Sequence, residues 1–241
     1  MRAVICGANG AMGKLICGIL GDEVVGKVSI DGEKGVPRTF EELGTVQADV
    51  VIDFSHHTAV ADVLHYAKAI GAAAVIGTTG HTAEEKALIA SAAEEIPVFY
   101  SGNMSLGIAV LCRLAKDAAR YFPDADIEIV EIHHNRKVDA PSGTAMMLFE
   151  SIHAVRQEAK PHCGRAGEGK REKSEIGISS LRLGTTVGIH EVHIHTGSQV
   201  LTLKHEAVNR QMLAEGGVDA ARFICGKAPG LYNMESLLEA R

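Results

Sequence analysis

Short apolar runs alternate with amphipathic stretches through residues 1–104. The apolar runs have the length of buried strands, and the stretches between them have the periodicity of helices with one face on a core. The expected strands are 2–6, 24–30, 49–54, 73–77 and 97–100, and the expected helices lie near 12–20, 58–70 and 82–93. Because parallel strands require helical crossovers, this alternation predicts a parallel, doubly wound sheet.

The pattern changes after residue 104. Residues 126–132 alternate apolar and polar side chains with period two, as a strand with one buried face does. The other expected elements are a long helix at 105–121, a helix from Ser142 to about 158, a polar mobile loop over 159–175, strands near 176–182, 187–196 and 199–206, and a helix near 211–225. Strands gathered late in the chain predict a second domain with a mixed or antiparallel sheet.

The predicted fold class is therefore α/β, with a Rossmann-like N-terminal domain and an inserted α+β domain. We expect residues 1–104 plus 212–241 to form the first domain and residues 105–211 to form the second. Extra glycine fits this class, because 26 of the 241 residues are glycine and tight turns or close backbone approaches to a ligand use it.

Charge and hydropathy exclude several classes of partner. The net charge is −6 and the chain has no long run of Lys or Arg, which argues against nucleic acid and against a membrane surface. No uninterrupted apolar run reaches the length of a membrane span. The chain opens directly on an apolar strand, and its five cysteines contain no C-x-x-C pair, so we expect a cytoplasmic protein with reduced thiols.

A glycine-rich turn follows the first strand and leads into the first helix. Its spacing is G-x-x-G-x-x-G, which allows backbone amides and a helix N-terminus to approach a pyrophosphate. An ordinary strand-to-helix turn is the alternative, but the position at the first turn of the alternation favours a dinucleotide. The predicted cofactor contacts here are Gly7, Ala8, Asn9, Gly10, Ala11 and Met12.

Further cofactor contacts are expected at the ends of later strands. Asp31 is the candidate for the adenosine ribose hydroxyls, although it could equally be a solvated turn residue. Two more segments rich in glycine and hydroxyl groups end parallel strands, where open sheets bind their ligands. These segments contribute Gly77, Thr78 and Thr79, and Ser101, Gly102, Asn103 and Met104.

A cationic loop follows the strand at 126–132. His133, His134, Arg136 and Lys137 lie within five residues, which neither a surface helix nor a core pattern requires. Histidine exchanges a proton near neutral pH, and hydride addition to an electron-poor double bond needs such a proton donor. The helix that begins after Ser142 offers amides and hydroxyls to a carboxylate, so an anion site lies beside the proton donors.

The run E-x-H-H-x-x-K-x-D-A-P-S-G-T-A, which begins at Glu131, resembles the signature of the 4-hydroxy-tetrahydrodipicolinate reductase family, also called dihydrodipicolinate reductases. The resemblance extends over the whole chain and includes the opening glycine turn, V-I-D-F-S, G-T-T-G, N-M-S, S-L-R-x-G and P-G-L-Y. It implies NAD(P)H-dependent reduction of 4-hydroxy-tetrahydrodipicolinate, through dihydrodipicolinate, to tetrahydrodipicolinate in diaminopimelate and lysine biosynthesis.

The resemblance also implies roles for individual residues. His133 would donate or accept the proton, and Lys137 would be a second proton donor; His134, Ser142, Gly143 and Thr144 would bind the small dicarboxylate substrate. NADH, NADPH or both would be the cofactor, with Met104 near the nicotinamide. Residues 105–211 would bind substrate and pair with other subunits in a homotetramer.

The sequence departs from the family at four places. Ser29 stands where relatives commonly carry an acid, which leaves the choice between NADH and NADPH open. Leu183, Ile189 and Glu206 replace common Gly, Glu and Arg residues, and from these we expect a shifted subunit interface. We expect no metal site, although His190, His193 and His195 lie close together in the sequence. The alternatives are another Rossmann-fold reductase of a small carboxylate or semialdehyde, and a nucleotide-sensing regulator without turnover.

Overall fold

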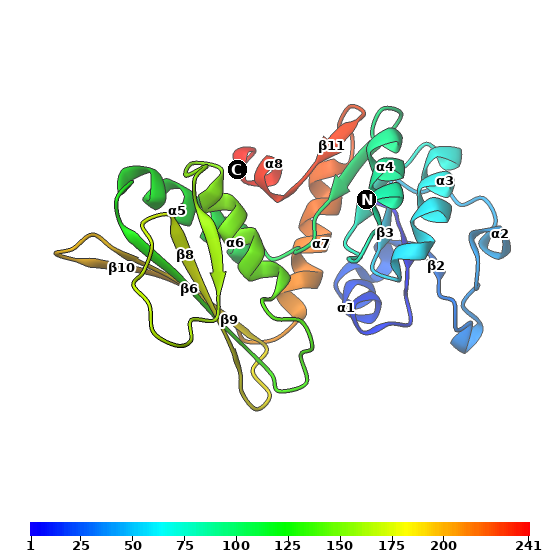
Figure 1. Cartoon of the computed structure of the whole chain (residues 1–241). Coiled ribbons are helices and arrows are strands. Elements are labelled where there is room, and N and C mark those ends of the chain that lie inside the picture. The colour runs from blue at the N-terminus through cyan, green and yellow to red at the C-terminus, as the bar shows by residue number, and fades with distance from the viewer. The chain divides into compact units, whose positions relative to one another are not determined.

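The computed structural model describes residues 1–241, with the side chain of Lys34 outside the description. The chain divides into two compact units (Figure 1). One contains Met1–Leu106 and Arg210–Arg241, and the other contains Gly107–Asn209. The chain therefore leaves the first unit, builds the second and returns.

The first unit is built on a parallel sheet. Its strands are β1 (Ala3–Cys6), β2 (Val24–Val28), β3 (Val50–Asp53), β4 (Ala73–Ile76), β5 (Pro97–Tyr100) and β11 (Gly230–Tyr232), in the order β11-β5-β4-β3-β1-β2. Every residue of β1, β3 and β4 is buried, as expected for parallel strands covered on both faces.

Helices cover both faces of this sheet. They are α1 (Ala11–Leu20), α2 (Phe40–Leu43), α3 (Val60–Ile70), α4 (Ala83–Ala92), α7 (Gln211–Ile224) and α8 (Met234–Glu239), with 3-10 turns at Gly21–Glu23, Glu33–Gly35 and His57–Ala59. Helices α3 and α4 pack on Val4, Val51 and Ala74, whereas α1 and α7 pack against one another. Helix α4 begins at the expected capping box, in which Thr82 and Glu85 bond reciprocally.

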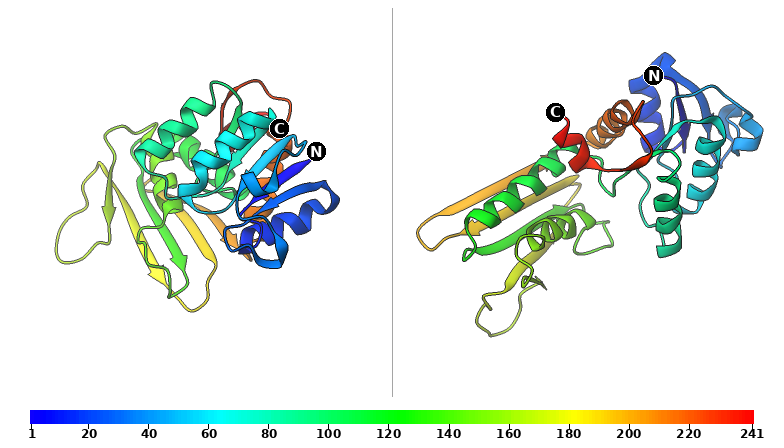
Figure 2. Two further views of the ribbon diagram at one scale, coloured as in Figure 1. Left: turned by 90° about the vertical axis from the view of Figure 1, so that its right-hand side faces the viewer. Right: turned by 90° about the horizontal axis from the view of Figure 1, so that it is seen from above.

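The second unit is a mixed sheet with helices on one face. Its strands are β6 (Asp126–His133), β7 (Lys160–Cys163), β8 (Glu175–Arg182), β9 (Gly188–His195) and β10 (Val200–Ala207), in the order β10-β9-β6-β8-β7. Helices α5 (Leu106–Tyr121) and α6 (Gly143–His153) lie along the sheet (Figure 2). They cover a core formed by alternate strand residues such as Ile127, Ile178 and Val192.

The α/β fold class is confirmed, but some expected elements are wrong. The second strand ends at Val28 instead of residue 30, and α6 ends at His153. The expected mobile loop at 159–175 instead contains β7, which pairs with β8, and Arg171 from the same stretch bonds to Asp126. Backbone pairing and a long-range ion pair order this segment, and neither depends on apolar patterning. In the part of the chain described here, no helix combines the length and apolarity that crossing a membrane requires.

Candidate active site

Three predicted cofactor segments lie at the same edge of the first unit's sheet. Residues 7–12 follow β1, residues 77–79 follow β4, and residues 101–104 follow β5. Because these strands are parallel, their carboxyl ends share one edge, which is where open α/β sheets bind ligands.

The glycines of the first segment bring backbone very close to backbone. Gly7 has a φ of +80°, and a Cβ there would lie too close to the carbonyl group of Phe54. A Cβ at Gly13 would overlap the carbonyl oxygen of Gly7. Gly10 begins helix α1 without a side-chain cap, so the first amides of the helix have no acceptor within it. This turn has the form of an anion cradle.

Asn9 joins this turn to the end of β2. Its Nδ2 donates to Oδ1 of Asp31 over 2.6 Å and to the carbonyl oxygen of Glu33 over 3.2 Å. The backbone amide of Glu33 also donates to Asp31. The hydrogen bond from Asn9, followed by the one from Glu33, lowers the pKa of the Asp31 carboxyl. Asp31 is exposed, and these hydrogen bonds order its carboxylate beside the glycine turn.

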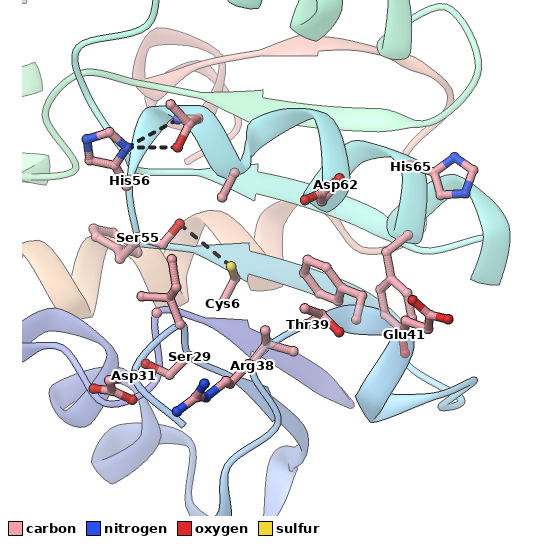
Figure 3. Close-up of a pocket in the computed structure, with 18 of the residues that line it drawn as sticks. Cys6, Ser29, Asp31, Arg38, Thr39, Glu41, Ser55, His56, Asp62 and His65 are labelled. Atoms are coloured by element: carbon pink, nitrogen blue, oxygen red, sulfur yellow. Dashed lines mark hydrogen bonds between the residues drawn. The ribbon is translucent and has the colours of Figure 1, made fainter. Parts of the chain in front are cut away.

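A cavity of about 1160 Å³ opens beside this turn (Figure 3). Gly7, Gly10 and Asp31 line it together with Ser29 and Arg38. Among the described side chains that line the cavity, residues 77–79 and 101–104 do not appear. The structure thus gathers the first glycine turn and the predicted ribose-binding residue at one cavity.

Thr78 connects the ends of β3 and β4. Its hydroxyl donates to Oδ2 of Asp53 over 2.6 Å and accepts from the amide of Ser55 over 2.9 Å. Burial raises the pKa of Asp53, and hydrogen bonds from Ser55 and Thr78 oppose this rise. The hydroxyl of Thr78 thus has internal partners, whereas Thr79 is exposed.

The segment after β5 is ordered by its own side chains. Oγ of Ser101 donates to the carbonyl oxygen of Asn103 over 2.7 Å, and Oδ1 of Asn103 accepts from the amide of Ser105. Met104 is only 2% exposed. A Cβ at Gly216 of α7 would overlap the Met104 carbonyl oxygen, so this glycine lets the helix approach the segment.

In the second unit, a buried carboxylate lies behind the predicted proton donor. The side chain of Glu131 is completely buried, and its Oε2 is hydrogen-bonded to Nδ1 of His133. Arg182 donates to both carboxylate oxygens, over 3.0 and 2.9 Å. Burial by itself would raise the pKa of Glu131, but hydrogen bonds from Arg182, Ser180 and His133 outweigh it and lower the pKa.

His190 packs against the ring of His133. The ring centroids are 5.1 Å apart in an edge-to-face arrangement, and Nε2 of His190 lies 3.3 Å from Oγ of Ser142. Burial, followed by the nearby His133, lowers the pKa of His190 to about 4, so its ring is neutral at pH 7. A Cβ at Gly188 would lie 3.2 Å from Nε2 of His133, so this glycine leaves room beside that nitrogen.

The predicted substrate residues lie on the loop and helix that follow. Nζ of Lys137 forms an ion pair of 2.7 Å with Asp139, and the Lys137 side chain is 21% exposed. Ser142 caps helix α6, because its hydroxyl accepts a hydrogen bond from the amide of Ala145. Ser142 is buried, and its own backbone amide donates to the carboxylate of Glu131. Gly143 is exposed and Thr144 is half-buried in the first turn of this helix. The signature loop thus places proton donors, a cation and a helix N-terminus in one region of the second unit.

Sequence reasoning gave no role to Glu131 or Arg182. The period-two pattern that buries Ile127 and Ile129 also buries Glu131, and it places His133 on the same strand face. This alternation along the strand was the signal in the sequence from which a buried Glu131 could have been predicted. Among the described residues, no group of His, Cys, Asp or Glu forms a metal site.

Comparison with known proteins covers both units. A family model described as the N-terminus of dihydrodipicolinate reductase matches residues 1–104, and one for the C-terminus matches residues 107–238. The chain is 43% identical to the 4-hydroxy-tetrahydrodipicolinate reductase of Alkaliphilus oremlandii, covering 99% of this chain and 98% of that protein. It is 41% identical to the enzyme of that name from Caldanaerobacter subterraneus, with the same coverage.

Solved structures agree with this similarity. A dipicolinate-bound dihydrodipicolinate reductase from Paenisporosarcina superposes with a TM-score of 0.79 and 26% identity over 97% of both chains. An amine dehydrogenase from Mycobacterium smegmatis superposes with a TM-score of 0.60 at 16% identity, which shows a shared fold alone.

Proposed function

The chain belongs to the dihydrodipicolinate reductase family, and on that premise we propose which of its residues carry out the reaction. It is an NAD(P)H-dependent oxidoreductase of lysine and diaminopimelate biosynthesis, and it reduces 4-hydroxy-tetrahydrodipicolinate through dihydrodipicolinate. The observation that supports the site assignment best is that Glu131 bonds to both His133 and the amide of Ser142 at the start of α6. Arg182 bonds to Glu131 and to the carbonyl oxygen of Asp139, the ion-pair partner of Lys137.

The first unit would hold the dinucleotide. The turn from Gly7 to Met12 fits a pyrophosphate, because its glycines remove the side chains that would block the backbone and its helix presents free amides. Asp31 would bind the adenosine ribose, residues 77–79 and 101–104 would hold the nicotinamide end, and Met104 would contact the ring. The cofactor, when bound, supplies a hydride to the substrate ring.

The second unit would hold the substrate and supply the proton. The substrate loses water to form dihydrodipicolinate, and a proton must reach the ring once the hydride has been added. His133 gives this proton, and Lys137 acts as a second proton donor. His134, Ser142, Gly143 and Thr144 bind the two carboxylates through an imidazole and the amides and hydroxyls of the helix N-terminus.

The proposal extends to the substrate class, the cellular location and the oligomeric state of the enzyme. A small dicarboxylate is the substrate, because a dipicolinate-bound relative superposes over nearly the whole chain. We expect a cytoplasmic homotetramer in which the sheets of the second units pair. Glu191, His193, Lys204 and Glu206 lie on the polar side of that sheet and would set the contact.

Loss of nicotinamide absorbance tests the proposal. Purified protein is mixed with NADH or NADPH and freshly generated 4-hydroxy-tetrahydrodipicolinate, beside a Lys137→Ala variant. Lys173→Ala is the matched control, because Lys173 is also paired with an aspartate but is 84% exposed. We expect the Lys137 variant to lose at least about 100-fold in kcat, the usual size of a general-acid contribution. Equal rates in both variants would remove Lys137 from the mechanism.

A further inference from the structure

Glu131 is a charged group buried beneath the signature loop. Its carboxylate is shared by residues from several elements: His133 on the same strand, Arg182 on β8, and the backbone amide of Ser142 at the start of α6, which donates over 3.2 Å. A buried carboxylate is costly unless such partners are present. The position of Glu131 is therefore fixed by its surroundings.

This contact determines which ring nitrogen of His133 carries a proton. An ionised carboxylate only accepts hydrogen bonds, so Nδ1 of His133 must be the donor to Oε2. The neutral ring is then protonated at Nδ1, and the imidazolium has its second proton on Nε2. The residue beside Nε2 is Gly188, where a Cβ would lie only 3.2 Å away, so the transferable proton is on the nitrogen that this position leaves without a side chain against it.

Arg182 limits how strongly the carboxylate can hold the imidazolium. In the sheet register Arg182 pairs with His133, and its guanidinium contacts both oxygens of Glu131. It also donates to the carbonyl oxygen of Asp139 over 2.6 Å, which ties the clamp to the loop that carries Lys137. A carboxylate with a fixed cation beside it attracts a second cation less strongly.

We propose that Glu131, clamped by Arg182, is a positioning residue that holds His133 in its Nδ1-protonated form and directs Nε2 at the substrate. This inference rests on the proposed role of His133 as the proton donor. Other charged or titratable groups near the imidazole are His190 on β9, His205 beside it on β10, and Lys137 with its partner Asp139. Burial lowers the pKa of His205, as it does that of His190, so neither competes for the proton at pH 7.

The first test is NMR of protein labelled with ¹⁵N-histidine and free of substrate. The chain has 12 histidines, and the signals of His133 are those that disappear in a His133→Gln variant. At a pH where the ring is neutral, Nδ1 should have the shift of a protonated nitrogen and Nε2 that of an unprotonated one. The opposite pattern in the wild-type protein would overturn the proposal, and this measurement needs no active variant.

The second test compares the pH dependence of kcat in Glu131→Gln and Arg182→Gln. Glu131→Gln removes the anion beside the imidazolium, so the midpoint of the decline in kcat with rising pH should move down by about one unit or more. Arg182→Gln frees the carboxylate to hold the imidazolium, so the midpoint should move up. For Glu131→Gln, kcat at neutral pH should fall on the order of 10- to 100-fold, a fraction of a full general-acid contribution, with KM changed much less.

Glu128→Gln is the matched control, because Glu128 is on the same strand, is also paired with an arginine, and faces the other side of the sheet. Its profile should coincide with that of the wild type. Shifts in the same direction for both test variants, or none, would show a merely structural role for Glu131. An active His133→Gln enzyme would instead refute the proton-donor role itself, whatever the NMR result.

Discussion

The close approach of helix α7 to the segment after β5 gives a quantitative prediction. In Gly216→Ala, the added carbon would overlap the carbonyl oxygen of Met104 and lie 2.8 Å from its carbonyl carbon. Gly18 of helix α1 is the matched control, because it is exposed and nothing lies within 4 Å of a Cβ there. Both substitutions exchange a helical glycine for alanine, so only the contact differs.

The two substitutions should change the free energy of unfolding in opposite directions. Alanine in place of glycine stabilises a helix interior by about 1 kcal/mol, and Gly18→Ala should gain roughly this amount. Overpacking typically costs about 1–3 kcal/mol, and a backbone carbonyl cannot rotate away, so the upper end applies to Gly216→Ala. After the helical gain, Gly216→Ala should lose about 2 kcal/mol.

Thermal unfolding and cofactor titration together test this reasoning. For a protein of this size about 2–4 °C corresponds to 1 kcal/mol, so Gly216→Ala should lower Tm by about 4–8 °C and Gly18→Ala should raise it by about 2–4 °C. Movement of the Met104 peptide should also raise the Kd for NADH and NADPH in the Gly216 variant alone. If Gly216→Ala is as stable as Gly18→Ala, the close contact does not constrain the fold.

Further predictions concern the second unit and the cysteines. Gly188→Ala would place a Cβ 3.2 Å from Nε2 of His133 and displace the ring by a few tenths of an ångström, so kcat should fall about tenfold while Tm changes little. Burial lowers the pKa of His190 from 6.5 to about 4, so the unfolded chain takes up this proton first. As the pH falls from 6.5 to about 4, the free energy of unfolding should therefore decrease by up to about 3 kcal/mol. Urea titrations at these pH values should show a smaller decrease in His190→Gln. Burial, followed by the charge of a nearby aspartate, raises the pKa of Cys6 to about 12, so iodoacetamide at pH 7.5 should modify exposed Cys163 and leave Cys6 intact until unfolding; mass spectrometry that finds Cys6 modified in the folded protein would contradict its burial.

The first unit could be predicted from the sequence because local patterns determine its elements. Strands β1, β3 and β4 are each a short, mostly apolar run between a turn and a helix. Such a run can be recognised without knowing which strands it pairs with. Strand β7 gave no such signal, since Lys160–Cys163 is a mostly exposed edge strand ordered by pairing with β8. Its existence depends on a neighbour that the local sequence does not identify.

The candidate site was predictable in its residue types but not in its connections. The cationic loop and the glycine turns are contiguous motifs, so their chemistry could be inferred directly. The contact of Arg182 with Glu131 joins residues 51 positions apart, and it exists because β6 and β8 are adjacent and parallel in a particular register. The contact of Asn9 with Asp31 likewise joins the segments that follow β1 and β2, which are adjacent and parallel.

That link between Asn9 and Asp31 has a consequence for coenzyme engineering. An attempt to switch the enzyme between NADH and NADPH would ordinarily begin at Asp31, the acidic residue nearest the end of β2. Here the same carboxylate fixes the glycine turn, so replacing it would also loosen the predicted pyrophosphate cradle and weaken both coenzymes. Ser29 lines the same cavity, but its side chain also hydrogen-bonds to the Asp31 carboxylate, so a substitution there changes discrimination and affinity together.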